Sequence, residues 1–289
     1  MTHMDADNAR ILQLMSRFLN EAPDFIRPEE VRMLTQDCGV GAQEAFALLL
    51  AAAVGLDAEA RPEDRALYHR YFPRMVRALD PAAFEADAYY RRVRVQGARE
   101  GRCALRQGRI APCEAFVCDD ILCPEDGRMI PQIGFFQRAF TYPAILEGGR
   151  EWMTVTPNEI ATMREPIARA HGRVLTYGLG LGYFAHGAAS RAEVESVTVV
   201  EQNADVIALF RRCILPQLEC GEKIRIVQDD AFAFAGARRA DDGFDFAFAD
   251  LWHDVGDGLP MYRRLRALEG RNPNTEYAYW IERSMRCYL

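Results

Sequence analysis

Lysine is almost absent from this sequence of 289 residues, in which Lys223 stands alone against a large excess of arginine. We interpret this bias as a coding preference, so single arginines carry little functional meaning. No apolar run is long enough to span a bilayer, and the opening stretch MTHMDADNAR lacks the pattern of a secretory signal peptide. The formal net charge of −7 makes nucleic acid an unlikely partner. We therefore expect a cytoplasmic protein without a membrane anchor.

Several catalytic and metal-binding motifs are also missing, among them the Walker sequence, the G-x-S-x-G elbow and any C-x-x-C pair. Eight cysteines are present. Cys113, Cys118 and Cys123 stand five residues apart and Cys103 lies upstream, and four thiolates are able to bind zinc. On a strand, however, steps of five place alternate side chains on opposite faces. We expect reduced, buried cysteines and no metal site.

Residues 1–90 are predicted to form a helical N-terminal domain. The stretch ARILQLMSRFLNEA has apolar residues at helical spacing and ends before Pro23. The following stretch, from Pro28 to Asp57, indicates two helices joined at CGVG, of which the second is nearly all apolar and should be buried. A helix-turn-helix DNA reader has a similar pattern, but no positive charge follows the turn, so we favour a small helical bundle.

Residues 91–150 are predicted to form a β-rich connecting segment. Short alternating runs are separated by glycine and proline, which is typical of a small antiparallel sheet. Arginines are concentrated between Arg91 and Arg109. They could hold an anionic substrate, but we favour the solvated face of a hairpin.

Residues 151–289 alternate between predicted strands and helices, which indicates a Rossmann-like, doubly wound and mostly parallel sheet in an α/β fold. Thr156-Pro157-Asn158-Glu159 matches a capping box, in which Glu159 reaches back to the Thr156 amide at the start of a helix. Only about twenty residues follow the stretch PMYRRLRALE. They allow a fifth strand and one short helix, so the sheet either ends early or is completed by the β-rich segment.

Three glycines, Gly178, Gly180 and Gly182, follow directly after the predicted strand RVLTY. In a parallel sheet, ligands bind beyond the carboxyl ends of the strands, and glycine lets a ligand approach the backbone there. Acidic residues follow the next three strands: Glu201 after VTVV, Asp229 and Asp230 after IRIVQ, and Asp250 after FDFAFA. A carboxylate at Glu201 can accept two hydrogen bonds from a ribose diol.

The order of these features over residues 172–255 resembles the core of the class I S-adenosylmethionine-dependent methyltransferases, most closely the spermidine synthase-like branch. The matching stretches are VLTYGLGLG, VTVVEQNADVI, IRIVQDDAFAF and FDFAFAD. The resemblance implies that Gly178, Gly180 and Gly182 lie against the methionine part of the cofactor. It also implies that Glu201 holds the ribose hydroxyls, and that Asp230 and Ala231 bind the adenine.

The sequence departs from that pattern at the expected reaction centre. Spermidine synthases keep an aspartate three positions after the acid that ends the fourth strand, and His253 stands there, beside Asp254. Thr176 replaces the acid that many methyltransferases place two positions before the first glycine, and the Asn-Pro-Pro-Tyr signature of adenine N6-methylation is absent. We expect His253 and Asp250 to be the catalytic residues, with His253 as a general base whose pKa Asp250 and Asp254 raise.

We therefore expect an enzyme that transfers a methyl group from S-adenosylmethionine to a small-molecule acceptor, with residues Trp152 to Asn158 forming one wall of the site. Three alternatives stay open: an aminopropyltransferase, a cofactor-binding domain without turnover, and a nucleic-acid modifier. Gly180, Gly182 and Ala185 also fit the dinucleotide fingerprint G-x-G-x-x-A. We disfavour NAD, because Asp230 and Asp250 have no role in that fingerprint.

Overall fold

The computed structural model describes residues 5–238 and 242–289, which form two compact units. Unit 1 comprises the described residues up to Ala83, together with Arg109–Thr141 and Leu289, and unit 2 comprises Phe84–Gly108 and Tyr142–Tyr288. The boundaries expected from the sequence, at residues 90 and 150, differ from these. The expected β-rich segment is divided between the units, because its long strands β3 (Cys103–Ile110) and β6 (Phe140–Glu147) each run across a unit boundary.

Unit 2 contains a five-stranded sheet in the order β10-β9-β8-β11-β12, and all four pairings are parallel. Its strands are β8 (Gly172–Tyr177), β9 (Val194–Glu201), β10 (Ile224–Gln228), β11 (Phe246–Ala249) and β12 (Glu276–Tyr279). The chain adds β9 and β10 on one side of β8 and then returns to add β11 and β12 on its other side. The strand order therefore reverses between β8 and β11. This is the doubly wound α/β arrangement that the sequence predicts.

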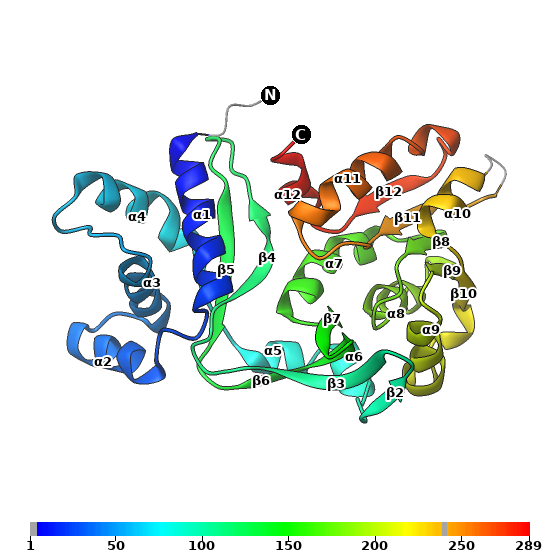
Figure 1. Ribbon diagram of the computed structural model, residues 1–289, viewed down its shortest axis with the longest axis horizontal. Helices are drawn as coiled ribbons and strands as arrows, with labels where there is room; N and C mark the ends of the chain where they lie inside the picture. The colour runs from blue at the N-terminus through cyan, green and yellow to red at the C-terminus, as the bar shows by residue number, and fades with distance from the viewer. Residues whose placement is uncertain (1–4, 239–241) are drawn as a thin grey trace. The chain divides into compact units, whose positions relative to one another are not determined.

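Helices cover both faces of this sheet, with α7, α8 and α9 on one side and α10, α11 and α12 on the other (Figure 1). They are α7 (Pro157–Arg169), α8 (Tyr183–Ala189), α9 (Ala204–Leu209), α10 (Ala231–Ala237), α11 (Val255–Arg266) and α12 (Glu282–Arg286). A π-helical turn, Phe210–Ile214, extends α9. The expected fifth strand and short final helix are confirmed as β12 and α12. The β-rich segment does not complete the sheet, which ends at β12 within the described residues.

A second sheet of unit 2 has the order β2-β3-β6-β7. It consists of β2 (Ala98–Glu100), β3, β6 and β7 (Arg150–Thr154), preceded by the short helix α6 (Ala88–Arg92). The pairs β2–β3 and β6–β7 are antiparallel, as the sequence predicts. Cys103 is buried at the start of β3.

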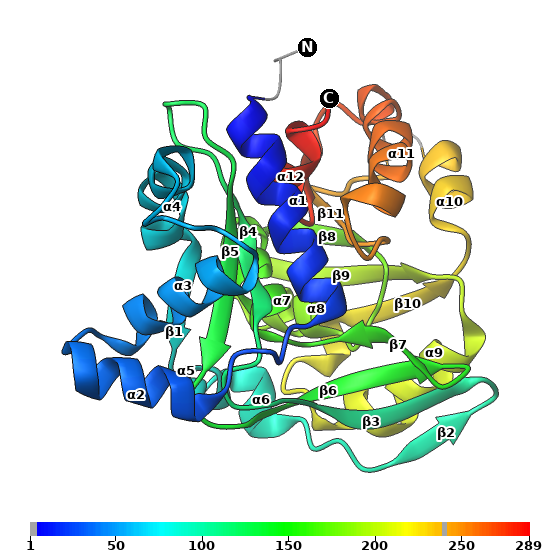
Figure 2. The ribbon, with the colours of Figure 1, turned by 60° about the vertical axis from the view of Figure 1, so that its left-hand side comes forward.

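Unit 1 combines helices with a three-stranded sheet in the order β1-β5-β4 (Figure 2). Its elements are α1 (Ala6–Glu21), α2 (Pro28–Cys38), α3 (Ala42–Ala53), α4 (Pro62–Met75), β1 (Val76–Leu79), α5 (Pro81–Glu85, whose last two residues belong to unit 2), β4 (Phe116–Leu122) and β5 (Ile130–Phe136). The three helices expected from the sequence correspond to α1, α2 and α3. Cys113 and Cys118 are buried in this unit, whereas Cys123 is exposed, contrary to the expectation that all these cysteines are buried. No helix in the described part of the chain combines the length and the hydropathy needed to cross a bilayer.

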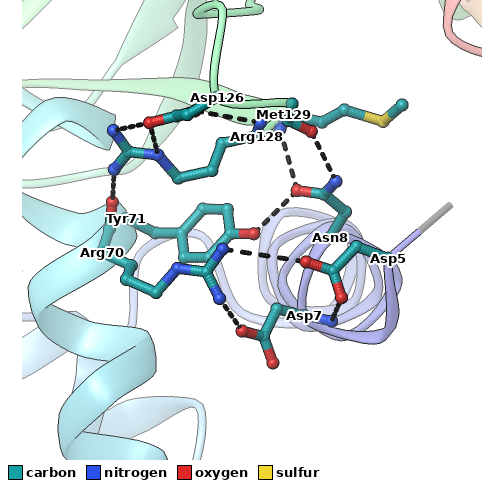
Figure 3. A network of polar contacts seen from close by, with 9 residues as sticks. Asp5, Asp7, Asn8, Arg70, Tyr71, Asp126, Arg128 and Met129 are labelled. Carbon is teal, nitrogen blue, oxygen red and sulfur yellow. Dashed lines mark hydrogen bonds and ion pairs between the residues drawn. The ribbon is translucent and has the colours of Figure 1, made fainter.

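A buried polar network joins α1 to α4 and to the β4–β5 connection in unit 1 (Figure 3). The side-chain oxygen of Asn8 accepts hydrogen bonds from the Tyr71 hydroxyl at 2.7 Å and from the Met129 amide at 2.8 Å. Its side-chain nitrogen donates to the Gly127 carbonyl at 3.0 Å. Asn8 is 2% exposed, so these groups have little access to water and depend on one another.

We predict that Asn8→Ala destabilises the protein by about 1–3 kcal/mol, because it leaves buried polar groups without partners. Urea denaturation followed by circular dichroism measures this change. Asn20→Ala is the matched control, because Asn20 is exposed near the end of the same helix and bonds only within it. Equal stabilities of the two variants would show that the network contributes nothing.

Candidate functional site

A pocket of about 650 Å³ lies at the carboxyl ends of the parallel strands in unit 2. Such a position, at the point where the strand order reverses, is where doubly wound sheets bind ligands. All lining residues belong to unit 2. They come from the ends of β8, β9, β10 and β11 and the turns that follow them, from β6 and β7, from the first turns of α7, α8 and α10, and from Met261 and Trp280.

The three glycines after β8 share a positive φ angle but differ in what surrounds them. All have positive φ angles, 97° at Gly178, 52° at Gly180 and 77° at Gly182. A Cβ atom at Gly178 would lie 2.1 Å from the backbone oxygen of Asp250, and one at Gly182 would lie 2.3 Å from the Phe210 ring. A Cβ at Gly180 would meet nothing within 4 Å. Gly178 and Gly180 line the pocket, whereas Gly182 is not among its lining residues and begins α8.

Glu201, at the end of β9, is hydrogen-bonded to the backbone of the glycine turn. Its carboxylate accepts hydrogen bonds from the Leu179 amide at 3.2 Å and the Asn203 amide at 2.7 Å. The Tyr89 hydroxyl fixes the other end of the turn by donating to the Leu181 carbonyl at 2.6 Å. Burial raises the pKa of Glu201, although the backbone hydrogen bonds oppose this effect. Glu201 also lines the pocket, so its carboxylate is shared between the turn and the cavity.

Asp230 and Ala231 lie at the end of β10, where the resemblance places an adenine. Asp230 is exposed and caps α10, since one of its carboxylate oxygens accepts from the Ala233 amide at 2.8 Å. Both residues line the pocket, as does Phe232 of the same helix. The structure therefore brings Gly178, Gly180, Glu201, Asp230 and Ala231 to one cavity.

Asp250, at the end of β11, lies close to a second carboxyl group, that of Glu159. Burial, and after it the neighbouring charge of Glu159, raises the pKa of Asp250 to about 8. Burial also raises the pKa of Glu159, against hydrogen bonds from Thr156 and Thr154. Both side chains line the pocket. A carboxyl group with this pKa takes up or releases a proton near neutral pH, as a general acid or base must.

Glu159 is a site residue that the sequence identified only as a helix cap. The capping box is confirmed, because the Glu159 carboxylate accepts from the Thr156 amide at 2.7 Å. Its other oxygen accepts from the Thr154 hydroxyl at 3.2 Å. Glu159 is also one of the lining residues of the cavity. The capping box was the available signal, since it fixes a carboxylate at the first turn of the helix that precedes the glycine turn.

His253 is arranged differently from the expectation. One ring nitrogen lies 3.1 Å from Asp257, and the other lies 3.2 Å from the Trp152 carbonyl oxygen. The acid beside His253 is therefore Asp257, one helical turn onward, while Asp254 caps α11. His253 is exposed and lines the pocket together with Trp152. Both ring nitrogens already have partners, and the roles of His253 and Asp250 as catalytic residues stay predictions.

The pocket lining has a strongly uneven charge. Seven carboxylates contribute to it, and no lysine or arginine does among the described residues. The acids are Glu147, Glu151, Glu159, Glu201, Asp229, Asp230 and Asp250. The arginines between Arg91 and Arg109 do not reach this cavity. A site of this kind attracts cations and repels anions.

Comparisons with known proteins give likeness in structure alone. No protein-family model matches the chain, and no curated protein matches it. A precorrin-8w decarboxylase of Methanobacterium thermoautotrophicum has 17% identity and a TM-score of 0.33 over 43% of this chain. A spermidine synthase of Thermotoga maritima has 16% identity and a TM-score of 0.33 over 61% of it. A putative O-methyltransferase of Klebsiella pneumoniae has 19% identity and a TM-score of 0.27 over 35% of it.

This chain spans 63%, 53% and 43% of the lengths of those three proteins, respectively. The matches therefore concern part of a fold, at low identity. They do not carry an activity to this chain, and the function has to be inferred from the residues of the pocket.

We predict that the stability of the wild-type protein falls, relative to Asp250→Asn, as the pH rises from about 4 to about 8. The pKa of Asp250 is raised on folding, so the folded state retains a proton that the unfolded chain has lost in this range. The difference grows by up to about 1.4 kcal/mol per pH unit. Urea denaturation at several pH values measures it, with Glu195→Gln, an exposed carboxylate on β9, as the control. A difference that does not change with pH would show that Asp250 titrates normally.

Proposed function

We propose that this protein is an S-adenosylmethionine-dependent methyltransferase that acts on a small-molecule acceptor. The observation that carries the proposal is the arrangement of the pocket at the switch point of the sheet. A glycine turn forms its base, and Glu201 and Asp230 follow at the ends of the next two strands outward. Asp250 lies on the other side, at the end of β11. This order supports a nucleoside-binding side near Glu201 and Asp230 and a reaction side near Asp250.

The chemistry of the lining fits this cofactor better than a dinucleotide. S-adenosylmethionine carries a positive sulfonium and a positive ammonium group, which the ionised carboxylates among the seven acidic lining residues attract. The pyrophosphate of NAD would enter the same cavity without any lysine or arginine among the described lining residues. The open space beside Gly180 leaves room for a ligand against the backbone. When bound, the cofactor supplies a methyl group that its sulfonium already activates.

The residues of this chain then have three tasks. Glu201 accepts hydrogen bonds from the ribose hydroxyls, and its contact with the Leu179 amide keeps the turn in register with the nucleoside. Phe184 and Phe248, stacked at 4.2 Å, form an apolar wall that restricts water. Asp250 takes up the proton that leaves the acceptor. Alignment of the acceptor for in-line attack accounts for most of the remaining catalysis.

We predict that Gly180→Val abolishes binding of S-adenosylhomocysteine, because the side chain would project into the ligand space. Calorimetry measures the affinity. The matched control is Gly55→Val in unit 1, since Gly55 also has a positive φ, 81°, and open space around it. The control also introduces valine at a positive φ, and Gly55 is not among the lining residues of the pocket. Unchanged affinity in folded Gly180→Val would remove the cofactor assignment.

We predict that Glu201→Gln weakens binding of S-adenosylhomocysteine by about 1–3 kcal/mol, the usual cost of losing a hydrogen bond to a charged group. Glutamine retains the size of the side chain and an oxygen for the Leu179 amide. Glu195→Gln, at an exposed position near the start of the same strand, controls for the change in charge. Equal affinities of the two variants would exclude Glu201 from the ribose contact.

An aminopropyltransferase is a second candidate, favoured by the absence of lysine and arginine from the described lining. Decarboxylated S-adenosylmethionine lacks the carboxylate that such a lining repels. Competition calorimetry with both forms separates the candidates. Tighter binding of S-adenosylmethionine supports methyl transfer, whereas a clear preference for the decarboxylated form supports aminopropyl transfer.

A further inference from the structure

We propose that Glu159 is a specificity-determining residue, which together with Asp250 selects an acceptor that presents a protonatable amine. The inference deepens the proposed function and rests on it for the reaction, although the selection itself concerns binding. It starts from the two carboxyl groups that line the reaction side of the pocket, on α7 and at the end of β11.

The Glu159 carboxylate is held in a fixed position. The Thr156 amide and the Thr154 hydroxyl donate to its two oxygens at 2.7 and 3.2 Å, and the Thr156 hydroxyl contacts it as well. A carboxylate fixed by its own helix start does not need to be reorganised when a ligand binds. Such preorganisation favours directional recognition of a cation.

Among the described lining residues, no lysine or arginine balances these carboxyl groups. Burial and mutual repulsion raise the pKa of Asp250, while burial raises that of Glu159, so the pair holds protons more readily than isolated acids do. The one basic residue in the described lining, His253, contacts Asp257 and Trp152 instead. An incoming ammonium group relieves the repulsion, whereas a carboxylate or phosphate increases it.

An unpaired hydrogen-bond donor in the pocket wall also indicates a polar ligand. Trp252 lines the pocket and is 4% exposed, and its indole N–H is buried without a hydrogen-bond partner among the described residues. Buried donors are rarely left unpaired in folded proteins. Met163, Phe184, Phe248, Met261 and Trp280 supply apolar surface in the same cavity, so the acceptor carries an apolar part beside its polar group.

The reaction balances with these residues and the cofactor. The bound ammonium first releases one proton to the carboxyl pair, which leaves a neutral amine. The nitrogen lone pair then forms a bond to the methyl carbon, while the carbon–sulfur bond breaks and its electron pair stays on sulfur. The nitrogen now bears the positive charge that the sulfonium has lost. An amine acceptor thus uses the proton-binding capacity of the pair, which a thioether acceptor, for example, would not need.

Calorimetric titration of three probes of similar shape tests the selection: phenethylamine, phenethyl alcohol and phenylacetate. Each is titrated into the protein alone and into the protein saturated with S-adenosylhomocysteine. We expect phenethylamine to bind at least about tenfold more tightly than the alcohol, as a charge-assisted hydrogen bond requires, and phenylacetate to bind most weakly. Glu159→Gln, which retains the capping contact, should remove the preference, and Asp250→Asn should weaken it. Glu195→Gln is the control and should retain it.

Equal binding of the amine and the alcohol to the wild-type protein would overturn the inference, and so would an undiminished preference in Glu159→Gln. Unchanged affinity of Glu159→Gln for S-adenosylhomocysteine would show that the effect concerns the acceptor side alone. If the wild-type protein selects the amine but binds no S-adenosylhomocysteine, the proposed methyl transfer fails while Glu159 remains the selective residue. The two failures are therefore distinguishable.

Discussion

The close approach of β8 and β11 at their carboxyl ends is the constraint on which the site depends. The backbone oxygen of Asp250 lies so near Gly178 that any Cβ there would come within 2.1 Å of it. The two strands therefore separate only beyond this point, and the chain after each of them turns outward to form opposite walls of the cavity. Gly178 fixes where the walls part, and the Asp250 amide, bonded to the Tyr177 carbonyl at 2.9 Å, holds that position.

Electrostatics then determine what the cavity accepts. Carboxyl groups line it from six separate segments, namely β6, β7, α7, and the ends of β9, β10 and β11. Repulsion among them is tolerated because most touch solvent and because backbone amides bind Glu159 and Glu201. Among the described residues no amide donates to the Asp250 side chain, and burial raises the pKa of Asp250 to about 8. Folding stability is reduced at this position, as is common where a protein arranges groups for chemistry.

Much of the larger unit follows from the sequence, because alternating strands and helices with acids at the strand ends specify a parallel sheet. The sequence does not reveal why each glycine is needed. A side chain at Gly182 would clash with the Phe210 ring, which lies in the turn that extends α9. Glu159 was recognisable as a helix cap. Its electrostatic interaction with Asp250 was not, because it depends on how α7 packs against the end of β11. His253 and Asp257 stand one helical turn apart, and the nearer acids in the sequence concealed that pairing. The parallel pairing of β1 with β5 in unit 1 had no local signal at all.

The central claim is that the pocket binds an S-adenosyl nucleoside rather than a dinucleotide. Side-by-side calorimetry of the wild-type protein with S-adenosylhomocysteine and with NADH tests it most directly. We predict saturable binding of S-adenosylhomocysteine to a single site and no measurable binding of NADH, whose pyrophosphate would meet seven acidic residues and, among the described lining residues, no lysine or arginine. Tighter binding of NADH than of S-adenosylhomocysteine would contradict the claim.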